Sequence, residues 1–242
     1  MGCILVATVF LHLPKTAGTS FRAALRAGFG EDQVTDSFDA SVMTPEMAAA
    51  MAPRAVVAGH ISITDVERFF PDARLFTVLR DPVDRCLSWY YYARVFPNTD
   101  HADVAAAHAL GVEDFFAADR AVTFRNIFNR QVRQLGDHVL NTDVDMDAAL
   151  ARAKEVLARC VWIGRQERLD ADSVRLGQVF PQMAGVRLGT LNVTPGRPAA
   201  REISPELRAA VAAHNRYDME LYAFAESLIA EAERPALHRR AV

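Results

Sequence analysis

The stretch that decides the fold is CILVATVFLHLPKTAGTSF, residues 3–21. Residues 3–12 are almost wholly apolar and rich in strand formers, which is typical of a central parallel strand covered on both faces. A short polar turn with Gly18 follows, and from Phe21 the apolar residues are spaced as on a helix. Strand, glycine-containing loop and helix in this order form the first half of a βαβ unit.

The rest of the chain continues this alternation. An aspartate and a serine, each followed by proline, mark two helix starts at Asp81-Pro82 and Ser204-Pro205. We predict one domain over residues 1–242, with a frayed tail from about 233, and an α/β fold that is P-loop-like, with three α/β/α layers around a central parallel sheet. Further strands are predicted at 55–58, 74–79 and 160–164, and helices from 82, within 97–120, and at 122–135, 146–159, 172–180 and from 204.

Composition narrows the class of protein. Of 242 residues, 51% are hydrophobic and 24% charged, which excludes a disordered, collagen-like or coiled-coil chain. The net charge of −3 gives no basic field for a nucleic-acid partner. Three distant cysteines make neither a disulfide framework nor a zinc site. No signal peptide or integral membrane segment is recognisable, so we expect a cytoplasmic protein.

The turn after the first strand is a candidate phosphate site. A helix N-terminus presents backbone N–H groups and the positive end of the helix dipole, and Gly18 lets the backbone approach an oxygen. The triphosphate loop G-x-x-x-x-G-K-[ST] places lysine after its glycines, whereas Lys15 comes first here, which favours a phosphate cradle without an obligatory metal. A plain turn with a surface lysine explains the loop equally well. The residues of the candidate cradle are Lys15, Thr16, Ala17, Gly18, Thr19 and Ser20.

A second candidate anion site follows the strand at 74–79. Arg80 stands at its carboxyl end, where open α/β sheets bind ligands, and a guanidinium binds phosphate through two hydrogen bonds. Ser88 lies two turns into the next helix. Alone, Arg80 is better explained by pairing with Asp81 or Asp84. Together, the two sites suit a nucleotide with phosphates on both sides of its ribose, such as 3′-phosphoadenosine 5′-phosphosulfate (PAPS).

These residues resemble a known family. Residues 12–21, HLPKTAGTSF, are similar to the 5′-phosphosulfate loop of PAPS-dependent sulfotransferases, and residues 79–92, LRDPVDRCLSWYYY, to their 3′-phosphate motif. The similarity is greatest to the carbohydrate branch that includes the uronyl and heparan sulfate 2-O-sulfotransferases. Residues 57–60 and 161–167 resemble further segments, so the likeness runs over roughly residues 3–230. The eukaryotic relatives carry a Golgi membrane anchor, whereas this chain resembles a bacterial type without one.

The resemblance implies roles for the candidate residues. The cradle from Lys15 to Ser20 would hold the 5′-phosphate and sulfuryl end of PAPS, and Arg80 and Ser88 its 3′-phosphate. In this family a late basic loop often lies near the adenine, and Arg197 in the segment 192–197 is its candidate here. PAPS is then the co-substrate, and no metal is expected.

The expected reaction is in-line transfer of a sulfuryl group to a hydroxyl of a carbohydrate or glycolipid, that is, a small-molecule or glycan acceptor. Lys15 is the candidate that stabilises the leaving phosphate. His60 is the candidate base, because it ends an apolar strand at the same sheet edge and aligns with the base of the 2-O-transferring relatives. His12 is a weaker candidate, and Asp36 and Asp39 are alternatives.

Other interpretations remain open from the sequence. The chain could be a P-loop-type small-molecule kinase that uses ATP and magnesium, or a nucleotide-binding module without catalysis in which His60 is structural. The lysine-first loop and the lack of an obvious acidic magnesium strand argue against the kinase. Asn126, Arg130 and Gln131 share one face of the predicted helix at 122–135, and this face either lines the acceptor site or is solvated.

Overall fold

The computed structural model describes residues 8–36, 43–97, 100–118, 125–137, 143–188 and 203–234. Four strands form one sheet in the order β2-β1-β3-β4, and every neighbouring pair is parallel. Three of them fall within two residues of the predicted positions, and β1 covers the end of the long first prediction. Their bounds are β1 Thr8–Leu11, β2 Val56–Gly59, β3 Arg74–Leu79 and β4 Trp162–Arg165.

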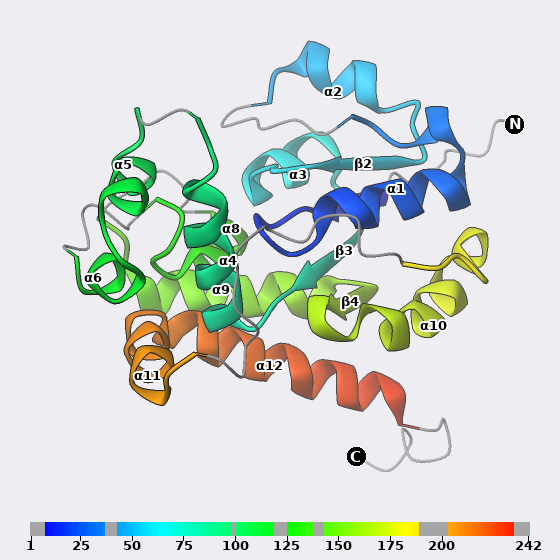
Figure 1. Cartoon of the computed structure of the whole chain (residues 1–242). Helices are drawn as coiled ribbons and strands as arrows, with labels where there is room; N and C mark the ends of the chain where they lie inside the picture. The colour runs from blue at the N-terminus through cyan, green and yellow to red at the C-terminus, as the bar shows by residue number, and fades with distance from the viewer. Residues whose placement is uncertain are drawn as a thin grey trace, which may run out of the picture.

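Helices surround the sheet (Figure 1). The described α-helices are α1 Gly18–Phe29, α2 Pro45–Met51, α3 Ile63–Phe69, α4 Pro82–Ala93, α5 Ala102–Ala109, α6 Val112–Ala117, α8 Arg130–Leu135, α9 Met146–Arg159, α10 Leu169–Val179, α11 Pro205–His214 and α12 Arg216–Glu233. Short 3-10 turns lie at η1 Glu31–Gln33, η2 Gln166–Arg168 and η3 Pro181–Met183. None of the helices in the described part of the chain is long and apolar enough to cross a membrane.

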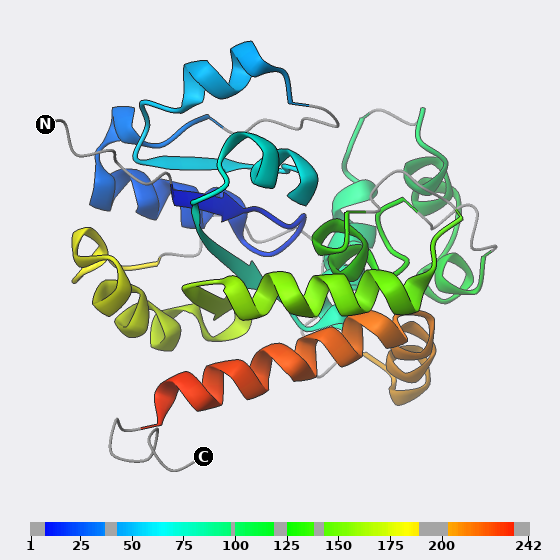
Figure 2. The same cartoon turned by 180° about the vertical axis from the view of Figure 1, so that it is seen from behind.

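Each face of the sheet is buried under its own helices because side chains alternate along a strand. In β1, Val9 and Leu11 join a core cluster with α3, α8, α9 and α12, whereas Phe10 joins a cluster with α1 and α10 on the other face. Figure 2 shows α9 and α12 side by side across the first of these faces. The predicted three-layer α/β/α fold with a central parallel sheet is therefore confirmed.

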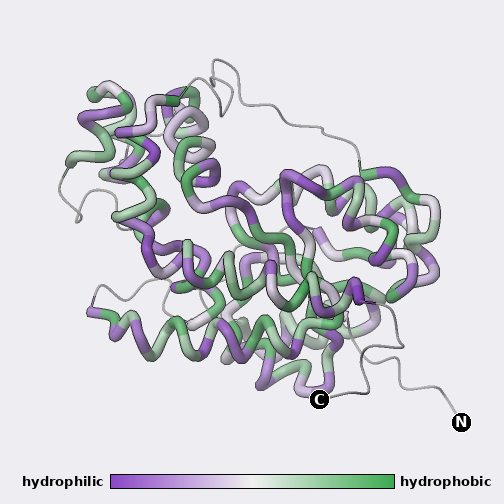
Figure 3. Tube along the Cα trace, turned by 90° about the horizontal axis from the view of Figure 1, so that it is seen from below, coloured by the Kyte–Doolittle hydropathy of each residue, from purple (hydrophilic) through white to green (hydrophobic). Residues whose placement is uncertain are grey.

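Amphipathic patterning explains how the helices sit on the sheet. Figure 3 shows apolar and polar residues alternating along the helices, as expected where one side packs inward. A third apolar cluster joins α4, α5, α6 and α11 at one end of the molecule (Figure 1). The chain thereby builds a wall beside the carboxyl ends of the strands, and α4 forms part of it.

The predicted helix starts are confirmed where a side chain caps the helix. Asp81 accepts a hydrogen bond from Asp84 N (2.9 Å) at the start of α4, and Ser204 from Leu207 N (3.2 Å) at the start of α11. The helix predicted over 122–135 is wrong in its first half. Residues 125–129 form turns, and α8 begins only at Arg130, because Asn129 adopts a left-handed conformation (φ 42°) that a helix cannot contain.

Candidate active site

A pocket of about 990 Å³ opens at the carboxyl edge of the sheet. Residues that follow each strand line it: His12 after β1, His60 after β2, Arg80 after β3 and Gln166 after β4. This is the edge where parallel α/β sheets bind ligands, because loops from all strands converge there. The lining residues that the structure describes are His12, Pro14, Lys15, Ala17, Gly18, Thr19, Ser20, His60, Arg80, Ser88, Trp89, Tyr92, Val95, Gln166, Glu167, Arg168, Leu169, Asp170, Ala171 and Leu188.

The loop after β1 directs the N-terminus of α1 into this pocket. Lys15 (φ 67°) and Ala17 (φ 65°) both adopt the left-handed conformation, which turns the chain sharply, and Ala17 makes no side-chain cap of α1. The first residues of the helix, Gly18, Thr19 and Ser20, line the pocket. Backbone N–H groups and the helix dipole therefore face the cavity, as an anion site requires.

Thr16 differs from its neighbours in the predicted cradle. Its side chain is fully buried, and Oγ1 donates to the carbonyl of Leu13 (2.9 Å). Thr16 is not part of the described pocket lining. Its hydroxyl therefore closes the turn from within, whereas the hydroxyl-bearing residues Thr19 and Ser20 border the cavity.

Gly18 is needed for a reason that the sequence did not reveal. A Cβ at this position would stand 1.6 Å from Nε2 of His12, so any side chain would overlap the imidazole. The glycine thus makes room for a neighbouring ring, in addition to any oxygen that the loop approaches. His12 itself lies between Phe10 (5.7 Å between ring centroids) and His60 (4.2 Å), with both pairs stacked.

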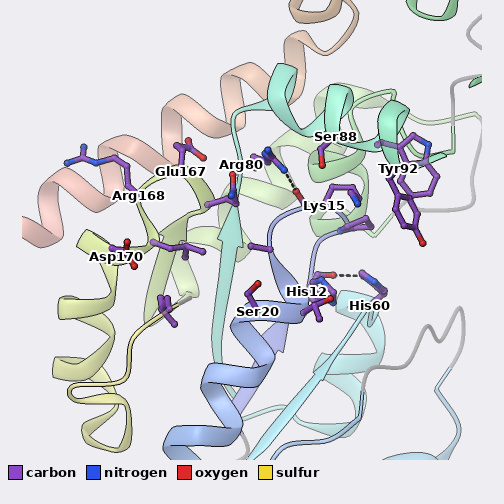
Figure 4. Close-up of a pocket in the computed structure, with 18 of the residues that line it drawn as sticks. His12, Lys15, Ser20, His60, Arg80, Ser88, Tyr92, Glu167, Arg168 and Asp170 are labelled. Atoms are coloured by element: carbon purple, nitrogen blue, oxygen red, sulfur yellow. Dashed lines mark hydrogen bonds between the residues drawn. The ribbon is translucent and has the colours of Figure 1, made fainter. Parts of the chain in front are cut away.

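Lys15 and Arg80, 65 residues apart in sequence, meet in the pocket. Nη1 of Arg80 donates to the carbonyl of Lys15 (3.0 Å), which ties the loop after β1 to the end of β3 (Figure 4). Nζ of Lys15 lies 3.9 Å from the centre of the Tyr92 ring. Ser88, on α4, borders the same cavity (Figure 4).

Asp81 and Asp84, which the sequence suggested as structural partners of Arg80, both form ion pairs with a different arginine. Asp81 and Asp84 lie 3.6 Å and 3.2 Å from the guanidinium of Arg208 on α11. These ion pairs join α4 to α11 on the side of the chain that builds the wall. Arg80 is held to the Lys15 carbonyl and points along the cavity, where a guanidinium can reach an anion.

His60 is oriented by a backbone carbonyl. Its Nδ1 lies 2.6 Å from the oxygen of His12, and a carbonyl only accepts, so Nδ1 carries the proton and Nε2 is the basic nitrogen of the ring. Nε2 of Gln134 donates to the same oxygen (2.8 Å). Burial, and then the nearby charges of His60 and Arg22, lower the pKa of His12 to about 3, so His12 stays neutral and suits a packing role better than proton transfer.

Helix α8 holds the ends of two strands. Oε1 of Gln131 accepts from Arg80 N (3.1 Å), and its Nε2 donates to Arg80 O (3.0 Å), so the side chain continues the sheet at the end of β3. Gln134, one turn later, holds His12 at the end of β1. Asp218 of α12 anchors α8 by accepting from the backbone N–H groups of Gln131 (3.2 Å) and Val132 (2.8 Å).

The interpretation of Asn126, Arg130 and Gln131 as a solvated face is wrong, because the three residues are only 8%, 6% and 1% exposed. None of them belongs to the described lining of this pocket. Asn126 precedes the helix and donates to Asp103 (2.7 Å). Their polar groups serve the interior, because a buried polar group needs a partner.

Sequence reasoning did not assign two parts of the pocket lining. The first is residues 166–171, which follow β4, and the second is the side chains of Trp89 and Tyr92 on α4 and of Val95 just beyond its end. The first part was detectable, because a fourth parallel strand must end at the same edge as the others. The second depends on how α4 turns about its axis, which no local pattern shows.

The remaining candidates lie elsewhere. Arg197 and Asp39 lie outside the described residues. Asp36 is exposed, hydrogen-bonds Arg26 and is not among the described lining residues. Within the described ranges, no group of three or more His, Cys, Asp or Glu residues could hold a metal ion.

Comparisons with known proteins gave matches of two kinds. A family model described as "Sulfotransferase family" matches residues 7–225. Among solved structures, the chain is similar to one titled "Crystal Structure of Sulfotransferase from Alicyclobacillus acidocaldarius", with 16% identity, a TM-score of 0.45, and coverage of 93% of this chain and 96% of that one. No curated protein matches the chain.

Proposed function

This chain belongs to the sulfotransferase family, and we propose that it transfers the sulfuryl group of PAPS to a hydroxyl of a carbohydrate or glycolipid. The observation that carries the proposal is that Lys15 and Arg80 border one cavity and are joined by a hydrogen bond of 3.0 Å. Two candidate anion sites that border the same cavity suit a nucleotide with phosphates on both sides of its ribose.

Different residues of the pocket bind the two phosphate-bearing ends of PAPS. The N-terminus of α1, with Thr19 and Ser20, receives the 5′-phosphate and the sulfuryl group, because N–H groups and the helix dipole favour negative charge there. The guanidinium of Arg80 and the hydroxyl of Ser88 receive the 3′-phosphate. The roles of Arg197 near the adenine, the likeness to the 2-O-sulfotransferase branch, and a cytoplasmic location remain sequence-based parts of the proposal.

The transfer needs a base and a charge that stabilises the leaving group. His60 accepts the proton of the acceptor hydroxyl at Nε2 while the acceptor oxygen bonds to sulfur. The bond between sulfur and the bridging phosphate oxygen breaks, and adenosine 3′,5′-bisphosphate leaves with that electron pair. Lys15 neutralises the charge that develops on the leaving oxygen, an interaction that is strongest in the transition state.

The competing functions make different demands. A P-loop-type kinase needs magnesium and a lysine placed after the loop glycines, and the family match does not favour it. A nucleotide-binding module without catalysis would bind the same nucleotide but transfer nothing. Binding and turnover therefore have to be measured separately.

Thermal unfolding with adenosine 3′,5′-bisphosphate, compared with ATP plus magnesium, tests the donor. We expect stabilisation by the bisphosphate that is lost in Lys15→Ala and Arg80→Ala. Stabilisation by ATP and magnesium alone would reject PAPS. Transfer of radiolabelled sulfate from PAPS to a mixture of sugars and glycolipids tests catalysis, and binding without any transfer in wild type would favour the non-catalytic module.

A further inference from the structure

The pocket has two ends that differ in charge. In Figure 4, Tyr92 and His60 lie on one side of Lys15, whereas Glu167, Arg168 and Asp170 lie on the other. Lys15 stands between them, at the point where the proposed transfer takes place. An acceptor hydroxyl has to reach the imidazole, so it enters from the end that holds His60 and Tyr92.

The last turns of α4 and the residues just after it form the wall of that end. Trp89 and Tyr92 of α4, and Val95 beyond its end, recur every third residue and all line the pocket; we call them the acceptor wall. Tyr92 contacts two other rings, with 5.7 Å between its centroid and that of Trp89 and 5.6 Å to that of Phe96. These ring contacts favour one orientation of Tyr92.

The acceptor wall carries no formal charge. Among the described lining residues, the full cations are Lys15, Arg80 and Arg168. The first two serve the donor phosphates, and Arg168 lies at the opposite end (Figure 4). An anionic acceptor would therefore meet the negative charge of the bound donor with no further cation among the described residues that line the pocket, and like charges placed together are costly.

We propose that the acceptor wall and His60 form a subsite for an uncharged hydroxyl compound that lays an apolar ring face against Tyr92, such as a neutral sugar ring or an aryl glycoside. Acidic polysaccharides are excluded from this subsite. The inference rests on the proposed sulfuryl transfer and names the acceptor class for it.

Lys15 links donor binding to this subsite. Its ammonium lies over the Tyr92 ring, 3.9 Å from the centre. A hydrogen bond between charged groups is stronger than the contact of a cation with an aromatic ring at an exposed site. A bound phosphate therefore draws Lys15 away from the ring, and that face of Tyr92 then becomes available to the acceptor.

Two glycosides of the same shape test the acceptor class. Phenyl β-D-glucoside and phenyl β-D-glucuronide differ at C6, which is a CH2OH group in the first and a carboxylate in the second, so phenyl β-D-xyloside, which has no C6, controls for the lost hydroxyl; each is assayed with labelled PAPS at low salt. We expect kcat/KM to be about tenfold or more higher for the glucoside, because the carboxylate meets the donor charge without a partner. Equal or higher kcat/KM for the glucuronide, or transfer to neither glycoside, would overturn the inference.

A charge added to the acceptor wall sharpens this test. Val95 is 58% exposed, and Val95→Lys places a cation beside the acceptor, so the preference for the glucoside should fall at least about threefold. The matched control is Val174→Lys on α10, at a valine that is 67% exposed and outside the lining of this pocket. We expect it to leave the preference unchanged, and an equal effect of the two variants would refute the acceptor wall.

The affinity for adenosine 3′,5′-bisphosphate is measured beside these assays by calorimetry. Failure of wild type to bind the bisphosphate contradicts the proposed function itself. Bisphosphate binding with transfer to mixed sugars, but without preference for the neutral glycoside, contradicts only the acceptor class.

Discussion

The His12 ring fills the space in which a side chain at Gly18 would lie, and this contact constrains the candidate phosphate loop. A Cβ on Gly18 would lie 1.6 Å from Nε2 of His12. His12 cannot withdraw easily, since it stacks on His60 at 4.2 Å. The loop and the candidate base are therefore coupled through one imidazole.

Gly18→Ala should destabilise the fold by about 1–3 kcal/mol or more, the usual cost of overpacking, and weaken bisphosphate binding. His12→Ala in the same chain removes the clashing ring and should restore part of the stability, as a double-mutant cycle in urea would reveal. Gly111→Ala is the control, because the nearest atom to its Cβ lies 4.0 Å away. Equal stability of the Gly18 and Gly111 variants would contradict the contact.

His12 also makes stability depend on pH. Its folded pKa of about 3 lies below the usual value of 6.5, so the unfolded chain binds this proton first as pH falls. The stabilisation is complete above pH 6.5 and is lost progressively down to about pH 3. Between pH 7.5 and 5, urea unfolding should show a loss about 2 kcal/mol larger in wild type than in His12→Gln. Parallel losses in the two proteins would mean that His12 is protonated in the fold.

At the scale of elements, α8 connects the two candidate sites. Gln131 holds Arg80 N at 3.1 Å, and Gln134 holds the His12 carbonyl, which His60 also uses, at 2.8 Å. The two glutamines are one turn apart, so a single short helix positions both the candidate phosphate-binding arginine and the carbonyl that orients the candidate base. Both are positioning residues, because neither is among the described residues that line the pocket.

Methionine, which has a similar shape but no amide, separates the two roles. Gln131→Met should raise the Kd for the bisphosphate several-fold, because the end of β3 loses its hold. Gln134→Met should leave this Kd unchanged but lower kcat and shift its pH profile, because His60 loses part of its orientation. Each variant is the control for the other, and identical effects on Kd and kcat would show that α8 acts only through stability.

A buried ion pair joins β4 to α10. Asp172 accepts from the backbone N (2.8 Å), Nε (3.1 Å) and Nη2 (2.8 Å) of Arg165. Asp172→Ala removes the buried partner of the Arg165 guanidinium, leaves it only the half-exposed Glu233 at 3.6 Å, and should cost about 3–5 kcal/mol of unfolding free energy. The comparison is Glu67→Gln, which weakens a more exposed pair with Arg152 and should cost about 0–1 kcal/mol. Similar denaturation midpoints for the two variants would contradict this ranking.

On the scale of the whole molecule, the four strand ends meet at one cavity, so a bound nucleotide holds distant segments together. At 100 times its Kd, the bisphosphate should add about 2.7 kcal/mol to the unfolding free energy. We expect the same gain with EDTA, because the candidate site uses N–H groups and cations as its phosphate ligands. Loss of the gain in EDTA would show that a metal takes part. If Arg80→Ala gains as much unfolding free energy from the bisphosphate as wild type does, measured without EDTA, then Arg80 is not part of the site.

Local sequence patterns predicted the strands, two helix starts and the loop after the first strand. The apolar strand runs, the helix starts at Asp81 and Ser204, and the loop around Gly18 were recognisable because each depends on residues a few positions apart. From the parallel order of strands it also followed that Lys15, His60 and Arg80 lie at one edge of the sheet. That much required no side-chain packing.

Only the tertiary structure decided how these residues are held. Three contacts join segments that meet only after folding. They are the His12 ring beside Gly18, the Gln131 side chain against Arg80, and the Lys15 ammonium over the Tyr92 ring. Asn129 shows the same limit, since its left-handed turn is stabilised by Asn215, 86 residues away (2.8 Å). Contacts of this kind depend on the rotation and packing of whole helices, which a local sequence pattern does not predict.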